Sequence, residues 1–187
     1  MKTQKINILF IIFFLAIPFF SNAQFEKAEF QASGLTCSMC SNAINKALKT
    51  VSFIESVNTD LNKNLFEINF KKNMPVDIDL IRKKVEDAGF SVAKFWVIVD
   101  LHNIKVDNET HANINGANFH FMNVKEQTLN GNQKLQVIDK NFVSNKEYKK
   151  FSAYTSLSCY QTGMMSNCCK SKDGTMALSG RIYHVTI

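Results

Sequence analysis

Two cysteines stand three positions apart in "GLTCSMCSNAINKAL", residues 34–48, where an extended segment gives way to a helix-forming one. Thiols at the spacing of Cys37 and Cys40 can hold a metal ion, exchange a disulfide or close a turn. Two thiolates are soft ligands that suit Cu(I) and also Hg(II), whereas structural Zn(II) normally takes four ligands. The pair therefore favours a soft ion, and zinc is expected only where another group joins.

A second group of sulfur-bearing residues lies in "CYQTGMMSNCCKSKDG", near the end of the printed sequence. Its thiolates and thioethers predict a secondary Cu(I) site. The alternative is a disulfide from Cys159 to Cys168 or Cys169, because spacing alone does not determine connectivity. Two histidines on expected strands, His120 and His184, are either nitrogen ligands or packing residues. The candidate sulfur ligands of this secondary site are Cys159, Met164, Met165, Cys168 and Cys169.

The hydrophobic pattern between Phe25 and Leu101 changes period in a definite order. "FEKAEFQASGL" predicts a strand, and the residues after Cys40 recur at helical spacing. "FIESVNTDL" and "LFEINF" predict a hairpin, and "MPVDIDLIRKKVEDAGF" predicts a helix capped by Asp77 and ended by Gly89. "FSVAKFWVIVDL" is the last expected strand. The order strand, helix, two strands, helix, strand predicts a ferredoxin-like α+β domain.

The cysteine loop, followed by "VEDAGF" at residues 85–90, resembles the heavy-metal-associated domain of copper chaperones, metal-transporting ATPases and the periplasmic mercury-binding protein. The resemblance covers roughly residues 26–99. It implies that Cys37, after the first strand, and Cys40, on the first helical turn, bind one ion together. That ion is most readily Cu(I), with Hg(II) or Zn(II) as alternatives. Leu35 stands where the family usually has methionine, which should alter packing more than ligation.

The resemblance also implies a function and partners. We expect binding and transfer or sequestration of Cu(I), with a metal-transporting ATPase or another metal carrier as partner through thiolate exchange. The alternatives are mercury binding and thiol-disulfide oxidoreduction by the same cysteines. The oxidoreductase hypothesis is weakened because Ser38 and Met39 stand between the cysteines, where thioredoxin-like proteins usually have Gly-Pro. The sequence contains no Ser-His-Asp set, phosphate loop or cofactor fingerprint, so it gives no case for an enzyme.

The first 23 residues have the pattern of a secretory signal peptide, with Lys2 and Lys5 before an apolar run and small residues at Ser21 and Ala23. The run is shorter than the roughly 20 residues that a membrane span needs. We expect cleavage near Ala23, a periplasmic or secreted protein, and no stable membrane insertion afterwards. The chain has a net charge of +6, and its basic residues are dispersed, which argues against nucleic-acid binding.

The pattern changes after Leu101, where turn signals such as Asn115-Gly116 and Asn130-Gly131 separate short apolar runs. This pattern predicts a small β-rich domain, for which an OB-like barrel is one interpretation, with a short helix at "NKEYKKF". The predicted organisation is a signal peptide at 1–23, the ferredoxin-like domain at 24–101 and the β-rich domain at 102–187.

Overall fold

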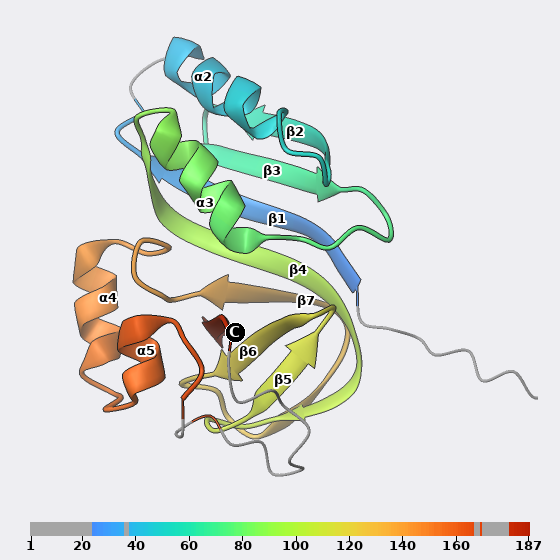
Figure 1. Ribbon diagram of the computed structural model, residues 1–187, viewed down its shortest axis with the longest axis vertical. Helices are drawn as coiled ribbons and strands as arrows, with labels where there is room; N and C mark the ends of the chain where they lie inside the picture. The colour runs from blue at the N-terminus through green and yellow to red at the C-terminus, as the bar shows by residue number, and fades with distance from the viewer. Residues whose placement is uncertain (1–23, 36–37, 167–168, 170–179) are drawn as a thin grey trace, which may run out of the picture.

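The computed structural model describes residues 24–35, 38–166, 169 and 180–187, and its elements are drawn in Figure 1. The predicted signal peptide, Cys37 and Cys168 lie outside the described residues. Within the described part of the chain, no helix is both long and apolar enough to cross a membrane. The strands are β1 (Gln24–Ser33), β2 (Ile54–Asp60), β3 (Leu65–Phe70), β4 (Ser91–Val106), β5 (His111–Ile114), β6 (Ala117–Phe121), β7 (Gln127–Val137) and β8 (Ile182–Thr186). The helices are α2 (Ser38–Leu48), α3 (Ile78–Asp87), α4 (Asn145–Ser152) and α5 (Ser158–Thr162).

The first half of the chain has the predicted order of elements. Strands pair in the order β2-β3-β1-β4, and α2 and α3 lie across one face of them (Figure 1). The Asp77 side chain accepts a hydrogen bond from the Leu80 amide at 3.0 Å, which caps α3 as predicted. Gly89 follows that helix at φ +88°, a left-handed conformation that glycine adopts without strain. The expected ferredoxin-like arrangement is therefore present over these elements.

The second half extends the same sheet. β7 pairs with the free edge of β4, and the complete strand order is β2-β3-β1-β4-β7-β8-β6-β5. Among the described residues this order is open at both ends, so the OB-like barrel is not confirmed. The short helix predicted at "NKEYKKF" is present as α4.

One predicted turn is wrong. Asn130-Gly131 lies inside β7 rather than between strands. Gly131 pairs with Leu101 at φ +69°, next to a shift of register between Leu101 and Ile104 on β4. The glycine thus accommodates a β-bulge on the neighbouring strand β4. Bulges and turns both favour glycine, so the sequence pattern alone does not distinguish them. Asn115-Gly116, by contrast, joins β5 to β6 as a turn.

One large cluster of buried hydrophobic residues extends through both halves. Phe95 on β4 lies between them: its ring centroid is 6.2 Å from that of Phe30 on β1 and 5.4 Å from that of Phe142, which precedes α4. The predicted division between residues 101 and 102 falls inside β4, which continues to Val106. The two halves therefore share a strand and a core.

Phe95→Ala tests whether the two halves depend on each other. The change removes a fully buried ring that contacts both halves, so we expect the free energy of unfolding to fall by about 3–5 kcal/mol. Urea unfolding, followed by Trp96 fluorescence and by far-ultraviolet circular dichroism, should show one common transition for the native chain and for the variant. Leu61→Ala, at a side chain that is 56% exposed, is the control and should change stability by less than about 0.5 kcal/mol. Two separate transitions in the native chain would contradict the shared core.

Candidate metal centres

The first candidate centre lies where β1 leads into α2. The helix begins at Ser38, which puts Cys40 in its first turn, half-buried. The positive end of a helix dipole favours negative charge at such a position. Met39 is 80% exposed, so the surface beside Cys40 is open to solvent. Leu35 packs against the core at the base of the loop.

Two asparagines hold the surroundings of this loop in place. The Asn45 side chain on α2 donates a hydrogen bond to the carbonyl oxygen of Val57 on β2 at 3.1 Å. The Asn64 side chain donates to the carbonyl oxygen of Ala32 on β1 at 2.8 Å. The C-terminal half of α2 is thus fixed to β2, and the end of β1 is fixed to the β2–β3 connection. Cys37 lies outside the described residues.

The second predicted group of sulfurs is divided by the fold. Cys159 on α5, Met165 and Cys169 are buried in one small cluster with Ile182. Met164, however, is 49% exposed. Cys168 lies outside the described residues. Of the four predicted sulfur ligands that the structure describes, three therefore lie in one buried cluster and Met164 lies outside it.

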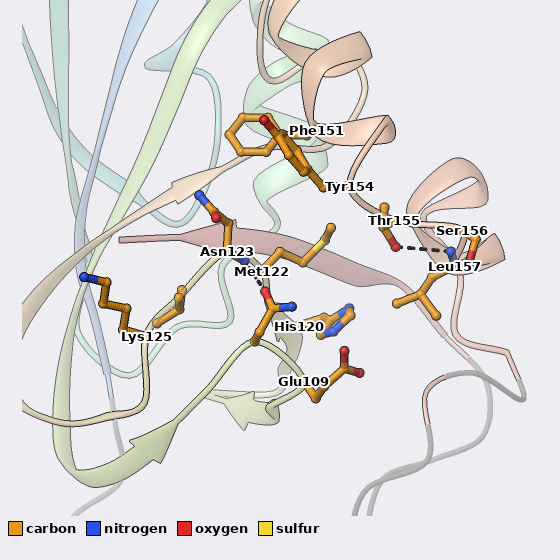
Figure 2. Close-up of a pocket in the computed structure, with 12 residues that line it drawn as sticks. Glu109, His120, Met122, Asn123, Lys125, Phe151, Tyr154, Thr155, Ser156 and Leu157 are labelled. Carbon is orange, nitrogen blue, oxygen red and sulfur yellow. Dashed lines mark hydrogen bonds between the residues drawn. The ribbon is translucent and has the colours of Figure 1, made fainter.

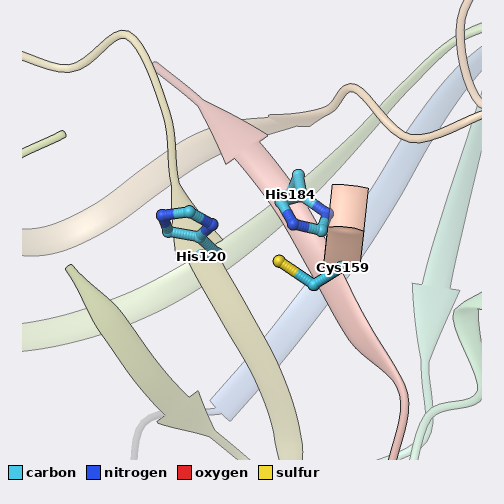
Figure 3. Close-up of side chains that lie close together, drawn as sticks. All are labelled: His120, Cys159 and His184. Carbon is cyan, nitrogen blue, oxygen red and sulfur yellow. The ribbon is translucent and has the colours of Figure 1, made fainter. Parts of the chain in front are cut away.

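The structure does bring Cys159 close to both predicted histidines (Figure 3). His120 on β6 and His184 on β8 are direct neighbours in a parallel pair, so their side chains lie on the same face of the sheet. Their ring centroids are 5.2 Å apart. The Sγ of Cys159 and one nitrogen of each ring all lie within 4.8 Å of one another, and all three residues are buried.

A chain of polar contacts, which the sequence analysis missed, leads from this cluster to the first half of the molecule. The Nδ1 of His184 lies 2.7 Å from Oδ1 of Asp139. The other oxygen of Asp139 accepts a hydrogen bond from Nη2 of Arg181 at 3.2 Å, and Nε of Arg181 donates to Asp79 on α3 at 2.7 Å. No sequence signal could have paired these residues, because Asp79 and Arg181 are 102 positions apart.

His120 is an uncharged imidazole in this setting. Burial, and then the charges of His111 and His184, lower the pKa of His120 to about 3. The His111 ring stacks on it with centroids 4.1 Å apart, which fixes its orientation. Among the described residues, three ring nitrogens have no partner at good hydrogen-bond geometry: both nitrogens of His120 and Nε2 of His184. The backbone of Asn108 makes only a weak contact with His120, which raises its pKa slightly against the effect of burial. A buried polar group without a partner lowers the stability of the fold by about 1–3 kcal/mol. The cluster is therefore unfavourable if its residues serve only to pack the interior.

Comparison with known proteins identifies the first half. Residues 29–91 match the heavy-metal-associated domain family. The copper chaperone CopZ of Staphylococcus haemolyticus is 30% identical over 59 residues, which cover 32% of this chain and 85% of the chaperone. This chain belongs to the heavy-metal-associated domain family. The elements β1, α2, β2, β3 and α3 lie within or overlap the matched segment, and it includes both Cys37 and Cys40.

Other relatives share the heavy-metal-associated segment. A probable copper-transporting ATPase, HMA5 of Arabidopsis thaliana, is 39% identical over 68 residues; these are 36% of this chain and only 7% of the ATPase. Among solved structures, the yeast copper transporter domain Ccc2a is 28% identical, with a TM-score of 0.32 over 35% of this chain and 88% of that domain. Apo-CopP of Helicobacter pylori is also 28% identical, with a TM-score of 0.32 over 36% and 98%.

Asp79→Asn tests the link between α3 of the heavy-metal-associated segment and Arg181. Burial by itself would raise the pKa of Asp79, but the hydrogen bond and charge of Arg181 outweigh it, and the pKa lies below its ordinary value of 3.8. A lowered pKa stabilises the fold above the ordinary pKa, and this contribution is lost as the pH falls through the folded-state value. We expect the variant to lose about 1–2 kcal/mol at pH 7, and the difference from the native chain to disappear in acid.

Urea unfolding at a series of pH values measures this difference. Asp87→Asn, on the same helix, is the matched control, because Asp87 pairs with Lys83 on the surface with side chains 50% and 62% exposed. We expect it to change stability by less than about 0.5 kcal/mol. A loss in Asp79→Asn that stays constant into the acid range would contradict the role of its charge.

Proposed function

We propose that this chain binds Cu(I) through Cys37 and Cys40 and transfers or sequesters it in the cell envelope. The observation that carries the proposal is a C-x-x-C sequence whose second cysteine lies in the first turn of α2, within the segment that matches the heavy-metal-associated family. Two relatives that share this segment are described as a copper chaperone and a probable copper-transporting ATPase. Copper is the cargo in this proposal, not a resident cofactor.

The chemistry of the two thiolates suits a carrier. Thiolates are soft donors and select Cu(I) over hard cations such as Mg(II) and Ca(II). Both must lose their protons to bind, so uptake of the ion releases protons and weakens in acid. Two ligands leave the ion open to attack by a third, and the exposed surface around Met39 lets another protein approach.

A metal-transporting ATPase or another metal carrier is the proposed partner. A thiolate of the partner adds to the bound Cu(I), and the bond to either Cys37 or Cys40 then breaks. A second exchange of the same kind completes the transfer, and copper remains Cu(I) throughout. The uncharged, exposed side chain of Met39 gives the partner an apolar contact beside the ion.

Replacing both cysteines by serine tests the site. Anaerobic titration of the reduced full chain with Cu(I), against a competing chelator, should show that Cys37→Ser/Cys40→Ser loses one tightly bound equivalent, because hydroxyls are poor ligands for Cu(I). Met39→Leu is the control: it removes the nearby thioether and should keep that equivalent. Undiminished binding by the double variant would refute the site, and tighter binding of Hg(II) with no uptake of Cu(I) would refute copper as the cargo.

Export is a separate part of the proposal, supported by the charged, apolar and small-residue pattern of residues 1–23. We expect the full-length sequence, expressed in a Gram-negative host, to yield a periplasmic product whose first residue is Gln24. Intact mass determines that end directly, also where the N-terminal glutamine has cyclised to pyroglutamate. Replacing Ala23 by a bulky residue, as in Ala23→Phe, should block cleavage, since signal peptidase sites require small side chains. A cytoplasmic product that retains Met1 would contradict export.

A further inference from the structure

We propose that His120, Cys159 and His184 form a second metal site, which binds a copper ion inside the second half of the molecule. The three residues come from β6, α5 and β8, so only the folded chain brings them together (Figure 3). This site shares no ligand with the C-x-x-C loop and does not depend on the proposed function of that loop.

The spacing of the ligand atoms fits one ion after a small contraction. Metal–nitrogen bonds of about 2.0 Å and metal–sulfur bonds of about 2.3 Å put three ligand atoms about 3.5–3.7 Å apart in a trigonal arrangement. The corresponding atoms lie within 4.8 Å of one another here. Side-chain rotations that draw the atoms together by about 1 Å would close the site without rebuilding the strands.

The two histidines are arranged as ligands rather than as hydrogen-bonded packing residues. The Asp139 carboxylate accepts the Nδ1–H of His184 at 2.7 Å, which leaves the lone pair of Nε2 for an ion. A carboxylate behind a ligating imidazole is a recurrent feature of protein metal sites, because it fixes the ring and its tautomer. His120 is buried, and among the described residues neither of its ring nitrogens has a partner at good hydrogen-bond geometry. The backbone of Asn108 makes the one weak contact that acts on this ring, so a nitrogen can turn to an ion at little cost.

The donor set favours copper. Two imidazoles and one thiolate in a three-coordinate arrangement are typical of copper sites, and copper heads the affinity order of the divalent first-row metals. Structural zinc prefers four protein ligands, and the hard cations prefer carboxylate oxygens. Met165 is buried in the same cluster as Cys159, which adds a thioether to the soft surroundings. With Cu(I), the thiolate and the ion together have no net charge, as a buried site requires.

A cavity provides a route to the site. It has a volume of about 610 Å³, and His120 and Met122 are part of its lining (Figure 2). The segment that leads from α4 to α5, including Tyr154 and Leu157, forms another part of its wall. An ion or a small carrier ligand can therefore reach His120 from outside, although the three ligating side chains themselves are buried.

The test uses the full chain with Cys37→Ser/Cys40→Ser as background, so that the first site cannot contribute. Anaerobic Cu(I) titration of the reduced protein against a chelator should show one remaining tight equivalent. Adding Cys159→Ser should weaken it at least 100-fold, whereas adding Cys169→Ser should not, because Cys169 is buried in the same cluster but is outside the ligand set. Loading with Cu(II) should give a thiolate-to-copper charge-transfer band that is present in Cys169→Ser and absent in Cys159→Ser.

Asp139→Asn tests whether the Asp139 carboxylate positions His184 for the ion or only stabilises the fold. We expect this variant to keep the charge-transfer band while its affinity falls about 10- to 100-fold, since the carboxylate orients His184 but does not bind the ion. Circular dichroism and thermal unfolding establish that each variant is folded. The proposal is overturned if the background variant binds no copper, if Cys159→Ser and Cys169→Ser lose it equally, or if Zn(II) displaces Cu(I) at equal concentration.

Discussion

The pairing of β4 along both of its edges is the constraint on which the rest of the molecule depends. β4 is 16 residues long and pairs with β1 on one edge and with β7 on the other. An exposed strand edge offers unpaired backbone groups to other chains, so covering it with β7 removes that risk. The same strand contributes Phe95 to the core of both halves. The C-x-x-C loop and the histidine cluster are therefore held by one sheet.

A set of ion pairs also links the two halves, in addition to the sheet. Arg181 lies between the carboxylates of Asp79 on α3 and Asp139 beside His184. A buried carboxylate is stable only when it is paired and hydrogen-bonded, and Asp139 is almost fully buried. Its second oxygen is occupied by Arg181, so its first oxygen is directed to His184. A helix of the heavy-metal-associated segment thus contributes, through Arg181, to the orientation of a histidine in the second half.

Local patterns predicted the first half well and the second half only in part. The cap at Asp77, the glycine at 89 and the β2–β3 hairpin depend on short-range chemistry, which the sequence displays directly. The addition of β7 to β4 and the parallel pairing of β6 with β8 depend on long-range contacts, which no local pattern encodes. The three residues of the second site were candidates in the sequence. Their proximity to one another, and the support of His184 by the Asp139 carboxylate, could not be predicted, because both depend on long-range contacts.

The two sites have opposite physical characters. At the first, Cys40 is half-buried at a helix end beside an exposed methionine, and the proposed function places the attack by a partner's thiolate there. The second is buried, and a carboxylate fixes one of its histidines. Such a site resists ligand exchange, since an incoming thiolate must enter the cavity before any bond can break. α2 contacts β2 at one edge of the sheet, whereas β6 and β8 lie toward the other (Figure 1). An ion transferred directly within one chain would have to travel along the width of the sheet, from β2 to β8. The arrangement therefore favours two sites that take up their ions independently, with exchange at the loop and retention at the histidines.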